Sequence, residues 1–189
     1  MSVGLDVSIA PRYLNRMVHM GLFFEYYRAA DREAALIRPE ASRTIEEPHG
    51  VAGFDAVETK WIDPWGTLNK LVALIGDVDL STELVGMVAL YPPLEGAPQS
   101  DEEWDALPED SPYLDGPGIE ELSVNVRDLL AEANDALLPA LVERWAQIEE
   151  FSHFSSVDME YLQSVAQELV GLSRRAKKHD QLLYCWMCA

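Results

Sequence analysis

The chain has 189 residues with 33 acidic and 14 basic side chains, which give a formal net charge of -19 at pH 7. This acidic balance argues against direct nucleic-acid binding, because phosphates are recognised largely through Lys and Arg. Two cysteines do not make a disulfide framework, and no apolar run reaches the roughly 18 residues of a membrane span. We therefore expect one soluble, cytoplasmic domain over residues 1–189, without a signal peptide or membrane association.

The first predicted element is a strand over Met20–Arg28, which is rich in the aromatic residues typical of strands. Residues 1–19 would then be an N-terminal extension. Alternation divides the strand into two faces, with Leu22, Phe24 and Tyr26 on one and Phe23, Glu25 and Tyr27 on the other. Asp31 predicts the cap of a short helix over 32–37. Residues 40–53 are expected to form a polar loop that contains His49.

A helix is predicted after Asp63, which can cap it, with Pro64 in its first turn and Gly76 at its end. Its apolar face would consist of Trp65, Leu68, Leu71, Val72 and Ile75. A tryptophan at this spacing is typical of a core. Because Trp61 and Trp65 also lie next to Lys60 and Asp63, they could instead line a ligand cleft.

An acidic region follows, because no Lys or Arg occurs between Lys70 and Arg127 whereas 13 acidic residues do. The prolines concentrate between Tyr91 and Gly118, so we expect these residues to form an irregular surface loop, called here the acidic loop. Trp104, Tyr113 and Leu114 are expected to attach the acidic loop to the body of the protein.

Helical periodicity returns at Ser123 and continues, after Asn134, in a second helix that reaches Ile148. A long amphipathic helix is predicted to begin at Ser155 and Ser156. Its apolar face would contain Leu162, Val165, Ala166, Leu169, Leu172 and Ala176. The uncharged run from Gln181 to Cys188 then predicts an interior strand, and its expected partner is the first strand. The predicted fold is a single α+β domain.

The terminal strand contains Cys185 and Cys188, whose CxxC spacing can serve redox or zinc chemistry. A redox pair requires a helix start, however, and zinc requires two further ligands that the sequence does not supply. In a strand, residues three apart face opposite sides, so two buried structural thiols are the simpler interpretation. We expect neither a metal nor a cofactor.

The predicted segments follow one another in a defined order. An aromatic strand with a glycine at its start (Met20–Arg28) precedes a short helix from Asp31 and a Lys-Trp-x3-Trp-x2-Leu segment over Lys60–Leu68. Paired helices, a long helix and an apolar terminal strand follow. This order resembles the YfbM-like family of small bacterial proteins of unknown function, over Met20–Ala189. The first 19 residues and the acidic loop depart from that pattern. The resemblance implies an α+β fold and no catalytic residues, since that family has no established activity.

No catalytic motif stands out in the sequence, so binding is the favoured function. The first hypothesis is a non-catalytic protein, for example an inhibitor or immunity-like protein, that binds a basic partner through Asp101, Glu102 and Glu103, with Trp104 and Tyr113 as anchors. The alternative is a small-molecule-binding protein or enzyme with a cleft lined by Tyr26, Tyr27, His49, Lys60 and Trp61. A pocket with converging polar groups would favour this alternative. The oligomeric state stays open.

Overall fold

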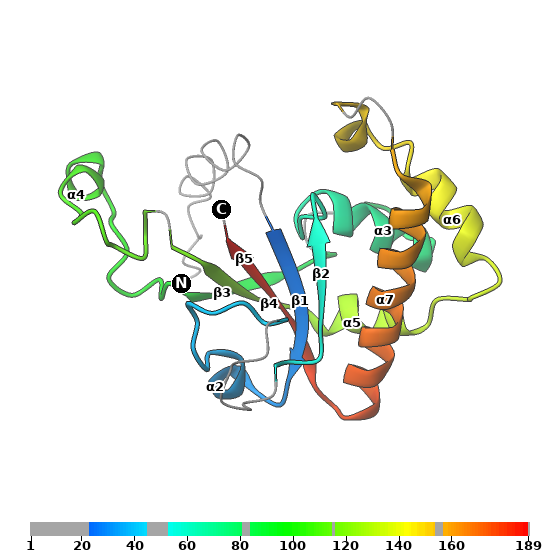
Figure 1. The fold of residues 1–189 in the computed structure, drawn as a ribbon, viewed down its shortest axis with the longest axis horizontal. Coiled ribbons are helices and arrows are strands. Elements are labelled where there is room, and N and C mark those ends of the chain that lie inside the picture. The colour runs from blue at the N-terminus through cyan, green and yellow to red at the C-terminus, as the bar shows by residue number, and fades with distance from the viewer. Residues whose placement is uncertain (1–22, 45–52, 81–83, 115, 154–156, 189) are drawn as a thin grey trace, which may run out of the picture.

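The computed structural model describes residues 23–44, 53–80, 84–114, 116–153 and 157–188. Five strands form one antiparallel sheet in the order β2-β1-β5-β4-β3 (Figure 1). Their bounds are β1 Phe23–Ala29, β2 Ala56–Lys60, β3 Met87–Tyr91, β4 Gly118–Leu122 and β5 Leu182–Cys188. The C-terminal strand therefore lies at the centre of the sheet, as an apolar run without charges requires.

The helices gather mainly on one face of this sheet (Figure 1). The four that cover it are α3 (Thr67–Gly76), α5 (Val124–Ala131), α6 (Leu138–Trp145) and α7 (Met159–Lys178). Two shorter helices, α2 (Arg32–Ala35) and α4 (Asp101–Asp105), and the 3-10 helix η1 (Glu149–His153) complete the order. The predicted α+β fold, with helices near Trp65, Leu129, Leu141 and Leu169 over a sheet, is confirmed.

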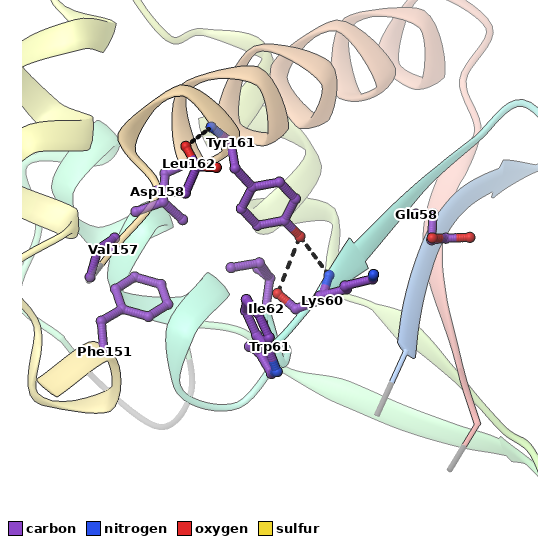
Figure 2. A pocket seen from close by; sticks show the side chains of 9 residues that line it. All are labelled: Glu58, Lys60, Trp61, Ile62, Phe151, Val157, Asp158, Tyr161 and Leu162. Atoms are coloured by element: carbon purple, nitrogen blue, oxygen red, sulfur yellow. Dashed lines mark hydrogen bonds between the residues drawn. The ribbon is translucent and has the colours of Figure 1, made fainter. Parts of the chain in front are cut away.

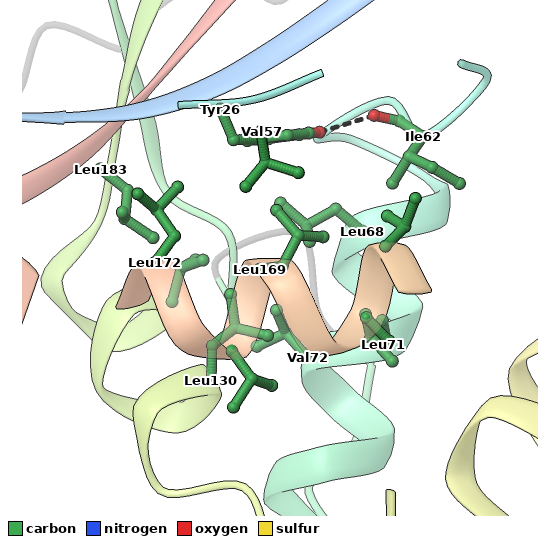
Figure 3. Close-up of a cluster of buried hydrophobic side chains, with 14 of the residues drawn as sticks. Tyr26, Val57, Ile62, Leu68, Leu71, Val72, Leu130, Leu169, Leu172 and Leu183 are labelled. Carbon is green, nitrogen blue, oxygen red and sulfur yellow. Dashed lines mark hydrogen bonds between the residues drawn. The ribbon is translucent and has the colours of Figure 1, made fainter. Parts of the chain in front are cut away.

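The main core lies between this face of the sheet and the four covering helices, and Figure 3 shows its centre. Leu169 and Leu172 of α7 pack there with Leu68 and Val72 of α3 beneath the sheet residues. The periodic apolar residues predicted for the long helix are all buried. Burying a side chain of this size contributes about 1.5–3 kcal/mol, so the helix face is a main source of stability.

The predicted pairing of the first and last strands is confirmed, since β1 and β5 are antiparallel neighbours with Phe23 opposite Cys188. Both faces of this pair are buried. Phe24 and Tyr26 enter the main core, whereas Tyr27 enters a second core on the opposite face. This second core also contains Ala29, Ala35, Ile119, Tyr184 and Trp186.

The second core is covered by residues 36–44, which follow α2 and bind the sheet through polar contacts. Glu25 is only 3% exposed, and its carboxylate accepts hydrogen bonds from the hydroxyls of Ser42 (2.6 Å) and Thr44 (3.2 Å) and from the backbone amide of Arg43. The Arg43 guanidinium lies 5.0 Å from the ring centre of Phe54 and 5.4 Å from that of Tyr27. Burying an isolated carboxylate costs free energy, and the hydrogen bonds to Glu25 offset this cost.

Several predicted element boundaries need correction. Asp31 does cap α2, accepting from the amide of Ala34 at 2.8 Å, but α2 ends at Ala35. Asp63 caps a turn ahead of α3, accepting from the amide of Gly66 at 2.6 Å, so this helix begins later than predicted. The N-cap of α7 is Asp158, whose side chain accepts from the amide of Tyr161 at 3.0 Å, and not the serines at 155 and 156.

Three strands were missed in the sequence. Residues 56–60 form β2 ahead of the predicted helix, and β3 and β4 lie at the two ends of the acidic loop, which therefore connects two neighbouring strands. The charged residues Glu120 and Glu121 hid the alternation of β4. The predicted N-terminal extension over residues 1–19 lies outside the described residues.

Candidate functional site

A pocket of about 360 Å³ lies at the end of β2, beside the first turns of α7 (Figure 2). One wall comes from β2 and the turn after it, and the opposite wall comes from η1 and α7. Its lining residues are Glu58, Lys60, Trp61, Ile62, Phe151, Val157, Asp158, Tyr161 and Leu162. The volume falls within the range of small-molecule sites.

Tyr161 joins the two walls. Its hydroxyl accepts a hydrogen bond from the backbone amide of Lys60 at 2.6 Å and donates one to the carbonyl of the same residue at 3.2 Å (Figure 2). Burial raises the pKa of the Tyr161 phenol, so the group is neutral at physiological pH. Because Lys60 engages both the donor and an acceptor position of this hydroxyl, Tyr161 presents mainly its ring to the pocket.

Trp61 stands at the rim of the pocket with an unusual backbone. Its φ is 63°, in the left-handed region that bulky residues seldom adopt, and its side chain is 51% exposed. Such a conformation costs about 1–3 kcal/mol and often marks a functional position. The Trp61 carbonyl accepts a hydrogen bond from the Thr67 hydroxyl at 3.3 Å, which helps to hold this backbone at the entry to α3.

The charged side chains of the pocket are Glu58, Asp158 and Lys60, all exposed. One oxygen of Asp158 caps α7, while the Lys60 ammonium lies 5.5 Å from the ring centre of Phe23. In Figure 2 the Lys60 side chain extends away from Phe151 and Val157. The pocket therefore combines three aromatic rings with two carboxylates and one ammonium that already contacts a ring.

The predicted alternative cleft is only partly assembled here. Lys60 and Trp61 line the pocket together, but Tyr26 and Tyr27 do not. Both tyrosines are fully buried, and they face opposite sides of the sheet because they are consecutive residues of a strand. The Tyr26 hydroxyl donates to the carbonyl of Ile62 at 2.7 Å (Figure 3), and the Tyr27 hydroxyl donates to that of Ala35 at 2.9 Å. His49 lies outside the described residues.

Tyr161 and Phe151 were not predicted to belong to the pocket. Tyr161 lies in the first turn of a long helix, next to the apolar stripe that predicts that helix. The one available signal was an aromatic residue beside that stripe, near an acidic cap. No sequence pattern relates it to Lys60, which lies 101 positions away.

The acidic loop is the second candidate site. In Figure 1 it extends away from the sheet, with α4 at its far end. Ser100 caps α4 by accepting from the amide of Glu103, and Asp101, Glu102 and Glu103 occupy its first turn, all exposed. Trp104 and Tyr113 are half-buried, and the Tyr113 hydroxyl donates to the carbonyl of Pro93 at 2.8 Å. The loop is thus largely irregular, as predicted, but contains a short helix.

Several acidic side chains elsewhere in the described structure have basic partners. Examples are Arg28 and Arg175 with Asp55, Arg32 with Glu121, Lys70 with Glu150, Arg174 with Asp135, and Lys177 with Glu132. Within the described residues, Glu102, Asp105, Glu109 and Asp110 of the acidic loop are exposed and form no ion pair. The acidic loop therefore carries charge that the body does not neutralise.

Glu120 of β4 and the two cysteines of β5 are further titratable side chains in the sheet. Glu120 lies opposite Cys185, facing the main core, and burial raises its pKa to about 7 although a hydrogen bond from Trp65 opposes the shift. Burial also raises the pKa of the Cys185 thiol. Cys188 is half-buried and packs against the second core, so the two thiols face opposite sides as predicted, but only Cys185 is fully buried. The described residues contain no cluster of side chains suited to a metal ion.

Comparison of the chain with family models, with curated proteins and with solved structures finds no match. The resemblance to the YfbM-like family therefore stays a prediction. None of the helices in the described ranges is both long and apolar enough to cross a membrane.

Proposed function

We propose that this protein acts by binding a basic protein partner through the acidic loop, as a non-catalytic inhibitor or immunity-like protein would. The observation that carries this proposal is the set of exposed acidic side chains without ion pairs at Glu102, Asp105, Glu109 and Asp110. Unneutralised charge on a projecting segment accelerates encounter with a partner of opposite charge and selects against partners of like charge.

The aromatic residues of the same loop supply the short-range part of the proposed interface. Trp104 and Tyr113 are half-buried, so each keeps part of its surface accessible, and the Tyr113 hydroxyl donates to the carbonyl of Pro93 within the same loop. Aromatic residues inside a charged rim concentrate binding energy in many interfaces. We expect Trp104 to act as the main anchor, because it lies in α4 among the exposed acids.

The test is affinity capture from native cell extract with the wild-type chain and two variants of equal net charge. One variant neutralises the loop (E102Q, D105N, E109Q and D110N). The matched control neutralises four exposed acids elsewhere (E40Q, D79N, E143Q and E149Q). We expect a partner that the wild type and the control capture at low salt, that high salt releases, and that the loop variant fails to capture.

Capture of the same partner by the loop variant, or equal recovery at both salt concentrations, would contradict the proposal. Circular dichroism of both variants checks that the substitutions leave the fold unchanged. Because the acidic loop projects from the sheet, we expect identical spectra.

The pocket beside Tyr161 favours a second candidate function, in which the protein binds a small molecule. Lys60 and Trp61, two residues of the predicted cleft, line this pocket together with Phe151 and Tyr161. This site and the acidic loop lie at opposite edges of the sheet, so each function can be tested without disturbing the other (Figure 1).

A further inference from the structure

We infer that the pocket beside Tyr161 binds an organic cation, with its ammonium or guanidinium head against the aromatic rings. This inference rests on the second proposed function, that the pocket is a ligand site. It names the chemical class of the ligand and the residues that would select it.

The walls of the pocket are rich in aromatic side chains. Trp61, Phe151 and Tyr161 line a space of about 360 Å³ together with the apolar side chains of Ile62 and Leu162 (Figure 2). Aromatic ring faces attract cations through their quadrupole, and such cages are a recurring way to recognise alkylated ammonium groups. Tyr161 contributes through its ring, because its hydroxyl is bonded to the Lys60 backbone.

The charges of the lining also favour a cation. Two carboxylates, Glu58 and Asp158, line the pocket, and the one ammonium of the lining, that of Lys60, already lies over the Phe23 ring. An anionic ligand would meet like charges, and the Asp158 side chain already caps α7 at the amide of Tyr161. The chain as a whole carries a formal charge of -19, which raises the local concentration of cations.

The backbone of Trp61 also bears on the site. Its left-handed φ of 63° accompanies a large, half-exposed ring at the rim of the pocket. A strained residue kept at a pocket is a sign of a functional constraint. We infer that Trp61 closes one side of the cation site.

A free small cation and the Lys or Arg side chain of a partner protein share this chemistry. Three probes separate the possibilities in NMR titrations of the full chain. Choline represents a free cation, 3,3-dimethylbutan-1-ol is its neutral isostere, and Nα-acetyl-lysine methylamide represents a partner side chain.

We expect choline or the lysine derivative to shift the signals of Trp61 and Tyr161, with the neutral alcohol binding at least about tenfold more weakly than choline. Whichever cation binds more tightly identifies the source. Equal binding of choline and the alcohol would overturn the cationic specificity and leave the pocket as a ligand site. Absence of binding by all three probes would overturn the pocket as a ligand site as well.

Variants locate the binding. Asp158→Asn keeps a good helix cap but removes the charge, so we expect it to weaken cation binding several-fold without changing the melting temperature. Glu160→Gln removes a charge from the same helical turn at a residue that does not line the pocket, and it is the matched control. Trp61→Ala should abolish binding, whereas Trp104→Ala in the acidic loop should not affect it. Cation binding that is unchanged in Asp158→Asn and Trp61→Ala would show that the cation binds elsewhere.

Discussion

The two edge strands of the sheet are protected in different ways against pairing with another chain. At the β2 edge, the charged residues Glu58 and Lys60 are exposed, and the Tyr161 hydroxyl binds the backbone of Lys60. At the β3 edge, the strand Met87–Tyr91 carries no charge, and Val88 is 44% exposed. A register shift between Ala89 and Tyr91 interrupts its ladder. Charges and a side-chain cap protect one edge, and an irregular strand followed by the acidic loop protects the other.

This difference separates the two proposed sites. A hydroxyl that caps an edge strand brings a helix end close to it, and the space that remains forms the pocket. The β3 edge instead leads directly into the acidic loop, whose charge discourages pairing with another copy of the same acidic chain. At each edge, the segment that protects the sheet from pairing with another chain therefore also contains the proposed binding site.

The largest expected effect comes from removing β5, because this strand lies between β1 and β4 and joins the two halves of the sheet. A chain without its last eight residues, 182–189, should show no cooperative thermal unfolding. The control is a chain that ends at Cys188, which keeps β5 complete. An unchanged cooperative melt after the longer deletion would contradict the central position of β5.

The next effect concerns pH and the consecutive residues Glu120 and Glu121 of β4. Burial raises the pKa of Glu120 from 4.5 to about 7. At pH values between these two numbers, the Glu120 carboxylate therefore takes up a proton when the chain folds. Its contribution to stability is therefore greatest below pH 4.5, falls as pH rises, and levels off above about pH 7. We expect Glu120→Gln to raise the free energy of unfolding at pH 8 by up to about 3 kcal/mol, and to have little effect at pH 4.

Glu121→Gln is the matched control, because Arg32 lowers the pKa of Glu121 on the opposite face of β4. Its stabilising contribution is present above its ordinary pKa and lost as pH falls. This variant should therefore be destabilised at pH 8, opposite in sign to Glu120→Gln. Urea unfolding from pH 4 to pH 8 gives both signs, and a stabilising Glu121→Gln would contradict the assignment.

The smallest expected effect comes from comparing one substitution at each edge of the sheet. Tyr161→Phe removes both hydrogen bonds to the Lys60 backbone, and we expect a loss of about 1 kcal/mol in urea unfolding, because the β2 edge loses its cap. Val88→Thr at the β3 edge keeps a branched side chain at an exposed position and should stay within about 0.5 kcal/mol of the wild type. Equal losses in the two variants would mean that the cap does not distinguish the edges.

The strongly periodic parts of the fold were predictable. The α7 stripe, the aromatic-rich strand β1 and the uncharged strand β5 each bury a continuous set of side chains, so their patterns appear directly in the sequence. β4 was not predictable, because Ile119 packs in the second core while the adjacent Glu120 and Glu121 interrupt the apolar alternation. β2 was hidden because Glu58 and Lys60 are exposed on an edge strand, where polar residues are tolerated.

The candidate site was predictable only where its residues are close in sequence. Lys60 and Trp61 are adjacent and drew attention as an aromatic and charged pair. Tyr161 and Phe151 reach them through tertiary packing, which a single sequence does not encode in any local spacing. Tyr26 and Tyr27 cannot line one cleft, because alternation along a strand places consecutive side chains on opposite faces of the sheet.

Residues 36–44 cover the second core, and their attachment to the sheet affects how this part of the protein unfolds locally. Residues 42–44 are attached to the sheet at Glu25, and the aromatic rings beneath them belong to Tyr27, Tyr184 and Trp186. Among the residues that the structure describes, none from a helix of the main core donates a hydrogen bond to the Glu25 carboxylate. The cover can therefore detach while α3, α5 and α7 stay packed, and its amides would then exchange with solvent faster than those of the helices. One sheet would thus carry two layers with separate opening equilibria.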